Sequence, residues 1–127
     1  MIDFILDASA VLALLNDETG SDAVTPLIPA SVICSVNLSE VIAKLLEKGV
    51  SEADVTTIIS VIGIGNIVDF DRQLSWEAGR LRPMTKQAGL SFGDRACLAV
   101  ACSRKFIAVT ADRSWETLSL CQVKTIR

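Results

Sequence analysis

The chain has 127 residues, half of them apolar, and carries 15 acidic and 12 basic residues but no histidine. That length fits one compact domain, residues 1–127, and the apolar content supplies a core, which excludes intrinsic disorder. The missing histidine excludes Ser-His-Asp and Cys-His nucleophiles and histidine-ligated zinc, so any catalysis must use carboxylates, hydroxyls, Lys, Arg, Cys or a metal held by oxygen.

Short apolar runs alternate with helical patterns along the whole chain. The expected strands are 4–6, 32–34, 67–70, 106–109 and 122–126. The expected helices cover about 8–16, part of 20–28, the segment from Asn37 to Gly49, the segment from Ser51 to about 62, 72–87 and 91–103. Asn37 is expected to cap its helix, and Pro83 to interrupt or restart another. Strands separated by helices indicate crossover connections, a parallel sheet with helices on both faces, and an α/β class.

Four acidic residues follow predicted strands or begin predicted helices. Asp7 and Asp112 follow the first and fourth strands, while Glu40 and Asp94 lie near helix starts. In an open parallel sheet, the carboxyl ends of the strands and the starts of the following helices share one edge, where ligands bind. We therefore expect the four acids to converge, although they are far apart in sequence.

A crowded set of carboxylates without Lys or Arg is electrostatically costly, because like charges repel one another. A hard divalent cation removes that cost, and all-oxygen ligands suit Mg²⁺ or Mn²⁺. Such a cation activates water and orients a phosphodiester for in-line attack. This reasoning favours metal-dependent phosphodiester hydrolysis.

Each acid also has a purely structural interpretation. The capping-box pattern fits two helix starts, at Asn37–Glu40 and at Ser91–Asp94. The acids that follow strands are equally suited to be helix N-caps or turn residues. Coincidence explains one such acid more easily than four acids at one predicted edge.

The segments around the four acids resemble the acidic motifs of PIN-domain proteins. They read F-I-L-D-A-S-A-V-L-A-L-L, N-L-S-E-V, G-L-S-F-G-D-R-A-C-L-A-V-A and V-T-A-D-R-S-W, in the family's order and spacing, from Ile2 to about Trp115. The third segment is the most specific. The short single-domain form is similar to the VapC toxins of bacterial toxin–antitoxin modules. The resemblance implies a three-layer α/β/α domain with a central parallel sheet of four to five strands.

The resemblance also implies an Mg²⁺-dependent endoribonuclease, with Mn²⁺ as a substitute, that leaves a 5′-phosphate and a 3′-hydroxyl. By position, the acids around the metal would be Asp7, Glu40, Asp94 and Asp112. Asp7 and Asp94 would be the more direct ligands, and the other two would act partly through water. Ser9 and Thr110 match family hydroxyl positions, where support of the ligands, a phosphate contact, a cap and a turn all stay open.

The implied partners are an RNA substrate, a cognate antitoxin and a second copy of the chain. Family members form homodimers, and their antitoxins insert a basic or aromatic side chain into the acidic groove. Charge is uneven along this chain, since residues 1–71 hold 11 acids and 2 bases whereas residues 72–127 hold 4 acids and 10 bases. A basic stripe in the second half is either a phosphate-contacting surface or an exposed helix face: Arg72, Arg80, Arg82 and Lys86.

The cysteines and the uncharged runs indicate a cytoplasmic protein without membrane association. The four cysteines form no C-x-x-C pair and have apolar or small neighbours, so buried free thiols are expected. Asp3 and Asp7 without an early Lys or Arg are unlike a signal peptide. The longest uncharged runs have 17 and 14 residues, fewer than the ~20 apolar residues of a membrane span.

Two other classes of function stay open. Asp69-Phe70-Asp71 resembles the nucleophile motif of haloacid-dehalogenase-like phosphatases, although Gln73 stands where that family has Thr or Val. A non-catalytic PIN-like binding module would keep the acidic pocket without cleaving RNA. Metal-dependent cleavage that is lost on changing Asp94 would identify the nuclease, whereas a trapped aspartyl-phosphate would favour the phosphatase.

Overall fold

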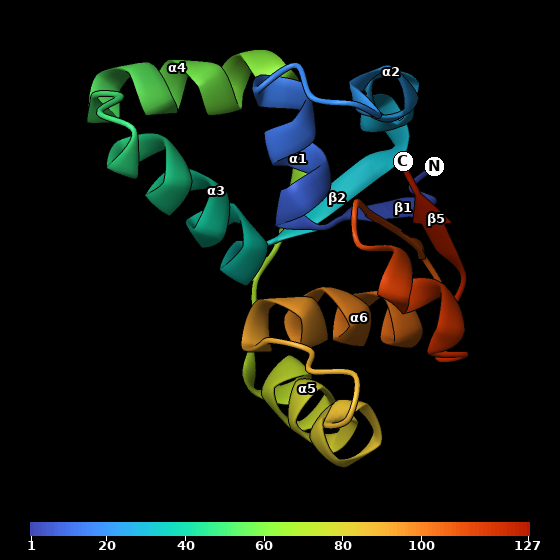
Figure 1. The fold of residues 1–127 in the computed structure, drawn as a ribbon. Helices are drawn as coiled ribbons and strands as arrows, with labels where there is room; N and C mark the ends of the chain where they lie inside the picture. Colours follow the sequence, from blue (N-terminus) through green and yellow to red (C-terminus); the bar gives the residue numbers. More distant parts are fainter.

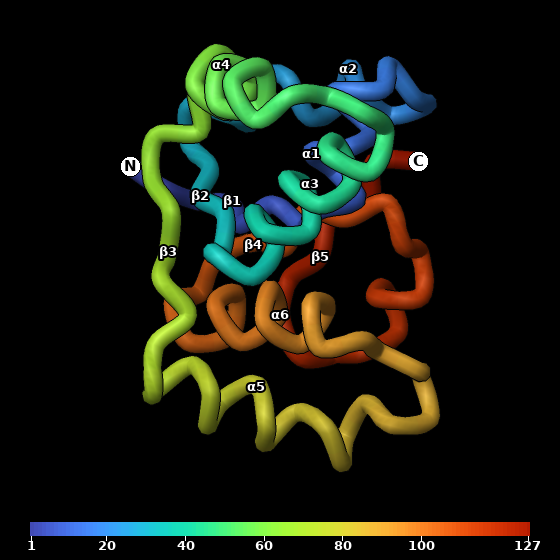
Figure 2. Tube along the Cα trace, turned by 90° about the vertical axis from the view of Figure 1, so that its left-hand side faces the viewer, coloured from blue at the N-terminus to red at the C-terminus, as the bar shows by residue number.

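Five short parallel strands form one sheet in the computed structural model, which describes residues 1–127. They are β1 (Phe4–Leu6), β2 (Ser31–Cys34), β3 (Asn66–Val68), β4 (Ile107–Thr110) and β5 (Val123–Thr125). Their order across the sheet is β3-β2-β1-β4-β5, so β1 lies at the centre (Figure 2). The expected strands are all present, and the sheet is parallel throughout.

Helices cover both faces of this sheet (Figure 1). They are α1 (Ala8–Leu15), α2 (Ser21–Val24), η1 (Thr25–Ala30), α3 (Ser35–Glu47), α4 (Glu52–Ile62), α5 (Arg72–Thr85), α6 (Phe92–Arg104) and η2 (Arg113–Thr117). Helices α1, α3 and α4 lie on one side of the sheet and α6 on the other, with α5 packed on the outside of α6 (Figures 1 and 2). This arrangement confirms the three-layer α/β/α expectation. None of the helices combines the length and the apolar character that crossing a bilayer requires.

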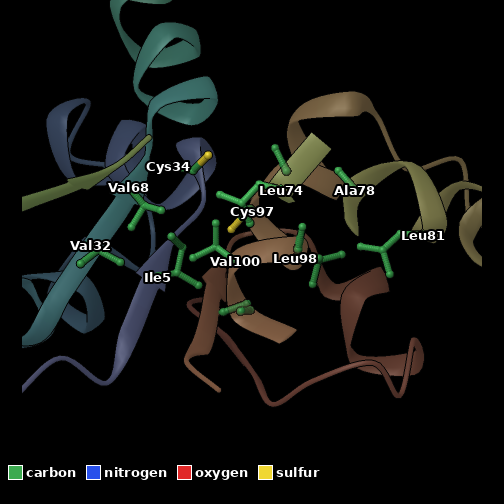
Figure 3. Close-up of a cluster of buried hydrophobic side chains, with 14 of the residues drawn as sticks. Ile5, Val32, Cys34, Val68, Leu74, Ala78, Leu81, Cys97, Leu98 and Val100 are labelled. Atoms are coloured by element: carbon green, nitrogen blue, oxygen red, sulfur yellow. The ribbon is translucent and has the colours of Figure 1, made fainter. Parts of the chain in front are cut away.

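The core is divided by the sheet because side chains alternate between its faces. Ile5 of β1 joins a cluster with α5 and α6, whereas the next residue, Leu6, joins a cluster with α1, α3 and α4. Val32 and Ile33 of β2 divide in the same way. The first cluster is drawn in Figure 3. Buried apolar residues on both faces of every central strand explain why these strands read as continuous apolar runs.

Helix α6 packs directly on the sheet because much of its surface is small and apolar. Its buried residues include Ala96, Cys97, Ala99 and Ala101. Its N-terminus, capped by Ser91, lies near the N-terminus of α3, beyond the carboxyl ends of β1 and β2 (Figure 1). The fold thereby brings the starts of α1, α3 and α6 to one edge, as expected for an open parallel sheet.

Two local expectations about helices are wrong. Helix α3 begins at Ser35 with Cys34 as its N-cap, so Asn37 lies inside the first turn and caps nothing. Helix α5 continues through Pro83 and ends two residues later. Proline removes one backbone donor and crowds the preceding turn. The helix tolerates this single loss, since the residues on both sides of Pro83 are helical.

The expectation of buried thiols holds for only half of the cysteines. Cys34 and Cys97 are buried, but Cys102 is exposed and Cys121 is partly exposed, and all four are free. Cys102 lies in the last turn of α6, where its Sγ donates to the Leu120 carbonyl at 3.5 Å.

Candidate active site

Asp7 lies at the centre of the carboxyl edge, between β1 and α1. Its backbone N–H donates to the Val109 carbonyl at 2.9 Å, which fixes it beside β4. Its side chain is only 5% exposed. Asp7 occupies the N-cap position of α1, yet its carboxylate makes no capping hydrogen bond. The carboxylate therefore does not serve the helix and is left to other partners.

Two hydroxyl groups hold the Asp7 carboxylate. Ser9 Oγ donates to Oδ2 at 2.6 Å, and Thr110 Oγ1 donates to the same oxygen at 3.1 Å. The backbone N–H groups of Ala111 and Asp112 donate to these two hydroxyl oxygens at 3.0 and 3.1 Å, which directs both hydroxyl protons toward the carboxylate. All of the side-chain bonds end on Oδ2, so Oδ1 is available to a ligand.

Glu40 reaches the same edge from the second turn of α3. Its Oε1 accepts a hydrogen bond from Asn37 Nδ2 at 2.9 Å, and its carboxylate lies against the backbone of Gly93 at the start of α6. The capping-box interpretation of Asn37 and Glu40 is therefore wrong. Because α3 starts two residues before Asn37, these side chains are one turn apart inside the helix and bond to each other.

Asp94 lies in the first turn of α6 and does take part in a capping box. Its backbone N–H donates to Ser91 Oγ at 3.1 Å, and its Oδ2 accepts from the Ser91 N–H at 3.0 Å. The box fixes the carboxylate at the N-terminus of the helix, with Oδ1 making no such bond. Capping and ligand binding are thus compatible for this residue.

Asp112 follows β4 and, like Glu40, is exposed, whereas Asp94 is half-buried and Asp7 is buried. Its Oδ1 accepts from the backbone N–H and the hydroxyl of Ser114, at 2.9 and 2.7 Å, which caps η2. Its N–H joins it to Thr110 and so to the Asp7 network. The capping interpretation is confirmed here, and the structure connects Asp112 to Asp7 through Thr110 only.

The electrostatics of Asp7 are those of a buried acid among other acids. Loss of solvent raises the pKa of Asp7 from 3.8 to about 6; the nearby charges of Asp94 and Glu40 add to this, and the bonds from Ser9 and Thr110 oppose it. Three of the four predicted acids are therefore close enough to influence one another.

The pKa of Glu40 is raised for similar reasons. Partial burial and the charge of Asp94 raise its pKa, and the hydrogen bond from Asn37 lowers it. No basic side chain balances these acids, because the ion pairs of the structure join Lys44 to Glu47 and Arg127 to Glu18.

The carboxylates at this edge are the type of ligand that a hard divalent cation prefers, although they do not surround a common point. The oxygens are carboxylates only, and they carry an excess of negative charge that a cation would relieve. No three acidic or cysteine side chains lie close enough together to ligate one ion. Asp7 and Asp94 each keep one oxygen outside the hydrogen bonds described above, which is consistent with a ligand role.

Asn37 and Gly93 are the site residues that the sequence analysis missed. Asn37 is fully buried and joins α3 to α6 through Glu40 and the Gly93 carbonyl. A signal was present, since both residues belong to the segments that carry two of the acids. The polar asparagine resembled a helix cap, and the glycine had no visible partner in sequence.

The two acids of the alternative phosphatase motif lie on either side of Phe70, between β3 and α5. Asp71 Oδ1 accepts from the Leu74 N–H at 2.9 Å and caps α5, and Asp69 is exposed at the end of the edge strand β3. The basic residues of α5 are all exposed, with the Arg80 guanidinium 5.7 Å from the centre of the exposed Trp76 ring. They form a solvent-facing surface outside the acidic edge.

Comparisons with known proteins agree with this fold. The PIN-domain family model matches residues 4–119. The DNA-bound VapBC complex from Salmonella typhimurium contains a chain that is 20% identical to this one, with 100% of both chains covered and a TM-score of 0.79. A toxin–antitoxin complex from Klebsiella pneumoniae gives 16% identity, 98% coverage of both chains and a TM-score of 0.79.

A third structure, VapBC-1 from nontypeable Haemophilus influenzae, is 17% identical over 98% of both chains, with a TM-score of 0.74. At these identities the solved structures establish the fold alone. No curated protein sequence matches the chain.

Proposed function

This chain belongs to the PIN-domain family, and on that premise we propose that it is a metal-dependent endoribonuclease, the toxin of a type II toxin–antitoxin module. One observation carries the proposal. A buried carboxylate, Asp7, is held by two hydroxyls beside the charges of Asp94 and Glu40, without a basic partner. Such an arrangement is unfavourable by itself and becomes favourable when a divalent cation binds.

The residues have distinct roles in this proposal. Asp7 and Asp94 would hold Mg²⁺, or Mn²⁺ in its place, and Glu40 and Asp112 would act partly through water. Ser9 and Thr110 keep the Asp7 carboxylate oriented by donating to Oδ2. The bound cation supplies activation of water and stabilisation of the leaving oxygen during hydrolysis of the phosphodiester.

A protein partner is supported by apolar side chains that the fold leaves in solvent. On the side of the sheet away from α5 they include Leu46 of α3, Val61 of α4 and Ile67 of β3, which are 40%, 78% and 47% exposed. Helices α3 and α4 also border a cavity of about 210 Å³, with Ile42 and Ile59 among its lining residues. We propose that a cognate antitoxin covers this face and places a basic or aromatic side chain beside the acids at the carboxyl edge of the sheet.

The remaining features of the proposal are a homodimer and a cytoplasmic location. Four free cysteines are typical of a reducing compartment. The oligomeric state is measured directly by light scattering after size-exclusion chromatography. A small DNA-binding protein encoded in the adjacent reading frame would supply the antitoxin.

The test is RNA cleavage by purified protein with Mg²⁺. Asp94→Asn should lower the rate at least about 100-fold, since loss of a ligand removes much of the cation's charge stabilisation, and EDTA should abolish the reaction. Wild-type products should carry 5′-phosphate and 3′-hydroxyl ends. Asp69→Asn, at an exposed position of the edge strand, is the matched control and should cleave normally.

Two results would contradict the proposal. Cleavage by Asp94→Asn at the wild-type rate would remove the assigned site. A folded wild-type chain that binds the antitoxin but cuts no RNA under any metal would favour the non-catalytic binding module.

A further inference from the structure

We propose that Asn37 and Gly93 together form a seat for the Glu40 carboxylate, so that Asn37 is a positioning residue of the metal site and Gly93 is glycine because the carboxylate occupies the space of its side chain. The inference rests on the proposed function and extends it to two residues outside the acidic set. The seat holds the Glu40 carboxylate of α3 against the start of α6.

The side chain of Asn37 makes two hydrogen bonds, one to Glu40 and one to the backbone of α6. Nδ2 donates to Glu40 Oε1 at 2.9 Å and to the Gly93 carbonyl oxygen at 3.0 Å. Both partners are acceptors only, so the amide must face them with its nitrogen and its orientation is unambiguous. One side chain thus joins the acid of α3 to the backbone of α6.

The burial of Asn37 carries a cost that packing alone does not explain. The residue is completely buried, and its Oδ1 has no hydrogen-bond partner. A buried polar atom without a partner is unfavourable, and an apolar residue would avoid it at this position. The next inward-facing residues of α3, Val41 and Leu45, are apolar. The two hydrogen bonds that Nδ2 donates offset this cost.

The Glu40 carboxylate fills the space that a side chain at position 93 would occupy. A Cβ added there would lie in hard contact with Glu40 Oε1 and 2.7 Å from both Cδ and Oε2. Gly93 is helical, so the backbone does not demand glycine. Gly79 is also helical, and a Cβ there would meet nothing within 4 Å. Glycine at 93 is therefore required by the carboxylate that lies on it.

A carboxylate held in this way is pre-positioned to contact a cation directly or through water. Groups that orient a metal ligand by hydrogen bonding typically contribute 10- to 100-fold to metal affinity. The seat leaves Glu40 Oε2 free of the Asn37 bond while it prevents the long side chain from turning into solvent. Loss of either half of the seat should release the carboxylate without removing it.

The experiment measures Mn²⁺ binding by isothermal titration calorimetry, without RNA. Gly93→Ala and Asn37→Leu should each weaken binding roughly tenfold, and Gly79→Ala should leave it unchanged. Gly93→Ala should fold, because the atoms that its methyl group meets belong to a flexible side chain. It therefore tests the seat even if Asn37→Leu does not fold.

The same two changes are then made in a Glu40→Ala background. If the seat acts through Glu40, neither change should weaken Mn²⁺ binding further, because interacting residues give non-additive effects. Equal losses in both backgrounds would mean a merely structural role and overturn the inference while the metal site stands. Wild-type protein that binds no Mn²⁺ would instead overturn the proposed function, and the seat with it.

Discussion

Replacing Asp7 by asparagine should stabilise the metal-free protein, although it removes a residue that we assign to the active site. The side chain is buried, and loss of solvent raises its pKa from 3.8 to about 6. The folded state therefore holds a proton that the unfolded state releases at lower pH. Ionisation of Asp7 opposes folding, which is the reverse of the usual behaviour of a paired carboxylate.

The magnitude follows from the difference between the two pKa values. Each tenfold change in proton affinity corresponds to ~1.4 kcal/mol, so the ionised group lowers the free energy of unfolding by roughly 3 kcal/mol at pH 7. This penalty is absent below about pH 4, grows between pH 4 and 6, and is constant above pH 6. The introduced amide oxygen can accept the bonds that Ser9 and Thr110 now donate, so little else should change.

Urea unfolding of wild type and Asp7→Asn in EDTA, at several pH values from 4 to 7.5, measures the effect. We expect equal stability at pH 4 and an advantage of about 2–3 kcal/mol for the variant at pH 7. The exposed Asp69→Asn is the control, and it should stay within about 0.5 kcal/mol of wild type at every pH.

Mn²⁺ at 1,000 times its Kd should reverse the order, because a ligand that binds only the folded state then stabilises the wild type by about 4.1 kcal/mol, which exceeds the advantage of the variant. A variant less stable than wild type at pH 7 without metal, or a difference that does not change with pH, would refute the reasoning. Either result would mean that the hydrogen bonds from the hydroxyls offset the cost of burying the ionised carboxylate at least completely.

Three further outcomes are expected. Mn²⁺ should raise the melting temperature of the wild type at lower concentration than Mg²⁺, and Asp94→Asn should abolish the shift, which differential scanning fluorimetry checks. Neutralising Arg80, Arg82 and Lys86 together should weaken RNA binding and flatten its salt dependence, because fewer counterions are released; unchanged affinity and slope across a salt series would make α5 only a solvated face. The hydrogen bond from the neighbouring Cys121 thiol lowers the pKa of exposed Cys102 to about 7, so iodoacetamide at pH 7.5 should modify Cys102 before the buried thiols, as peptide mass mapping would show.

Local pattern in the sequence was enough to predict most of the fold. The strands are short runs buried on both faces, so they appear as continuous apolar segments, and glycine and capping residues mark most helix ends. The pattern misplaced the start of α3, because β2 ends directly at Cys34 and the helix begins without a polar cap. It also overstated Pro83, which removes one backbone hydrogen bond without interrupting α5.

The acids could be selected from the sequence because a parallel sheet brings strand ends and helix starts to one edge, whatever the details of packing. The environment of each acid could not be predicted from the sequence. The burial of Asp7 and the hydrogen bonds that join it and Ser9 to the end of β4 depend on contacts between residues about 100 positions apart. The seat of Glu40 is such a contact, since a buried asparagine and a glycine have no meaning together until α3 meets α6.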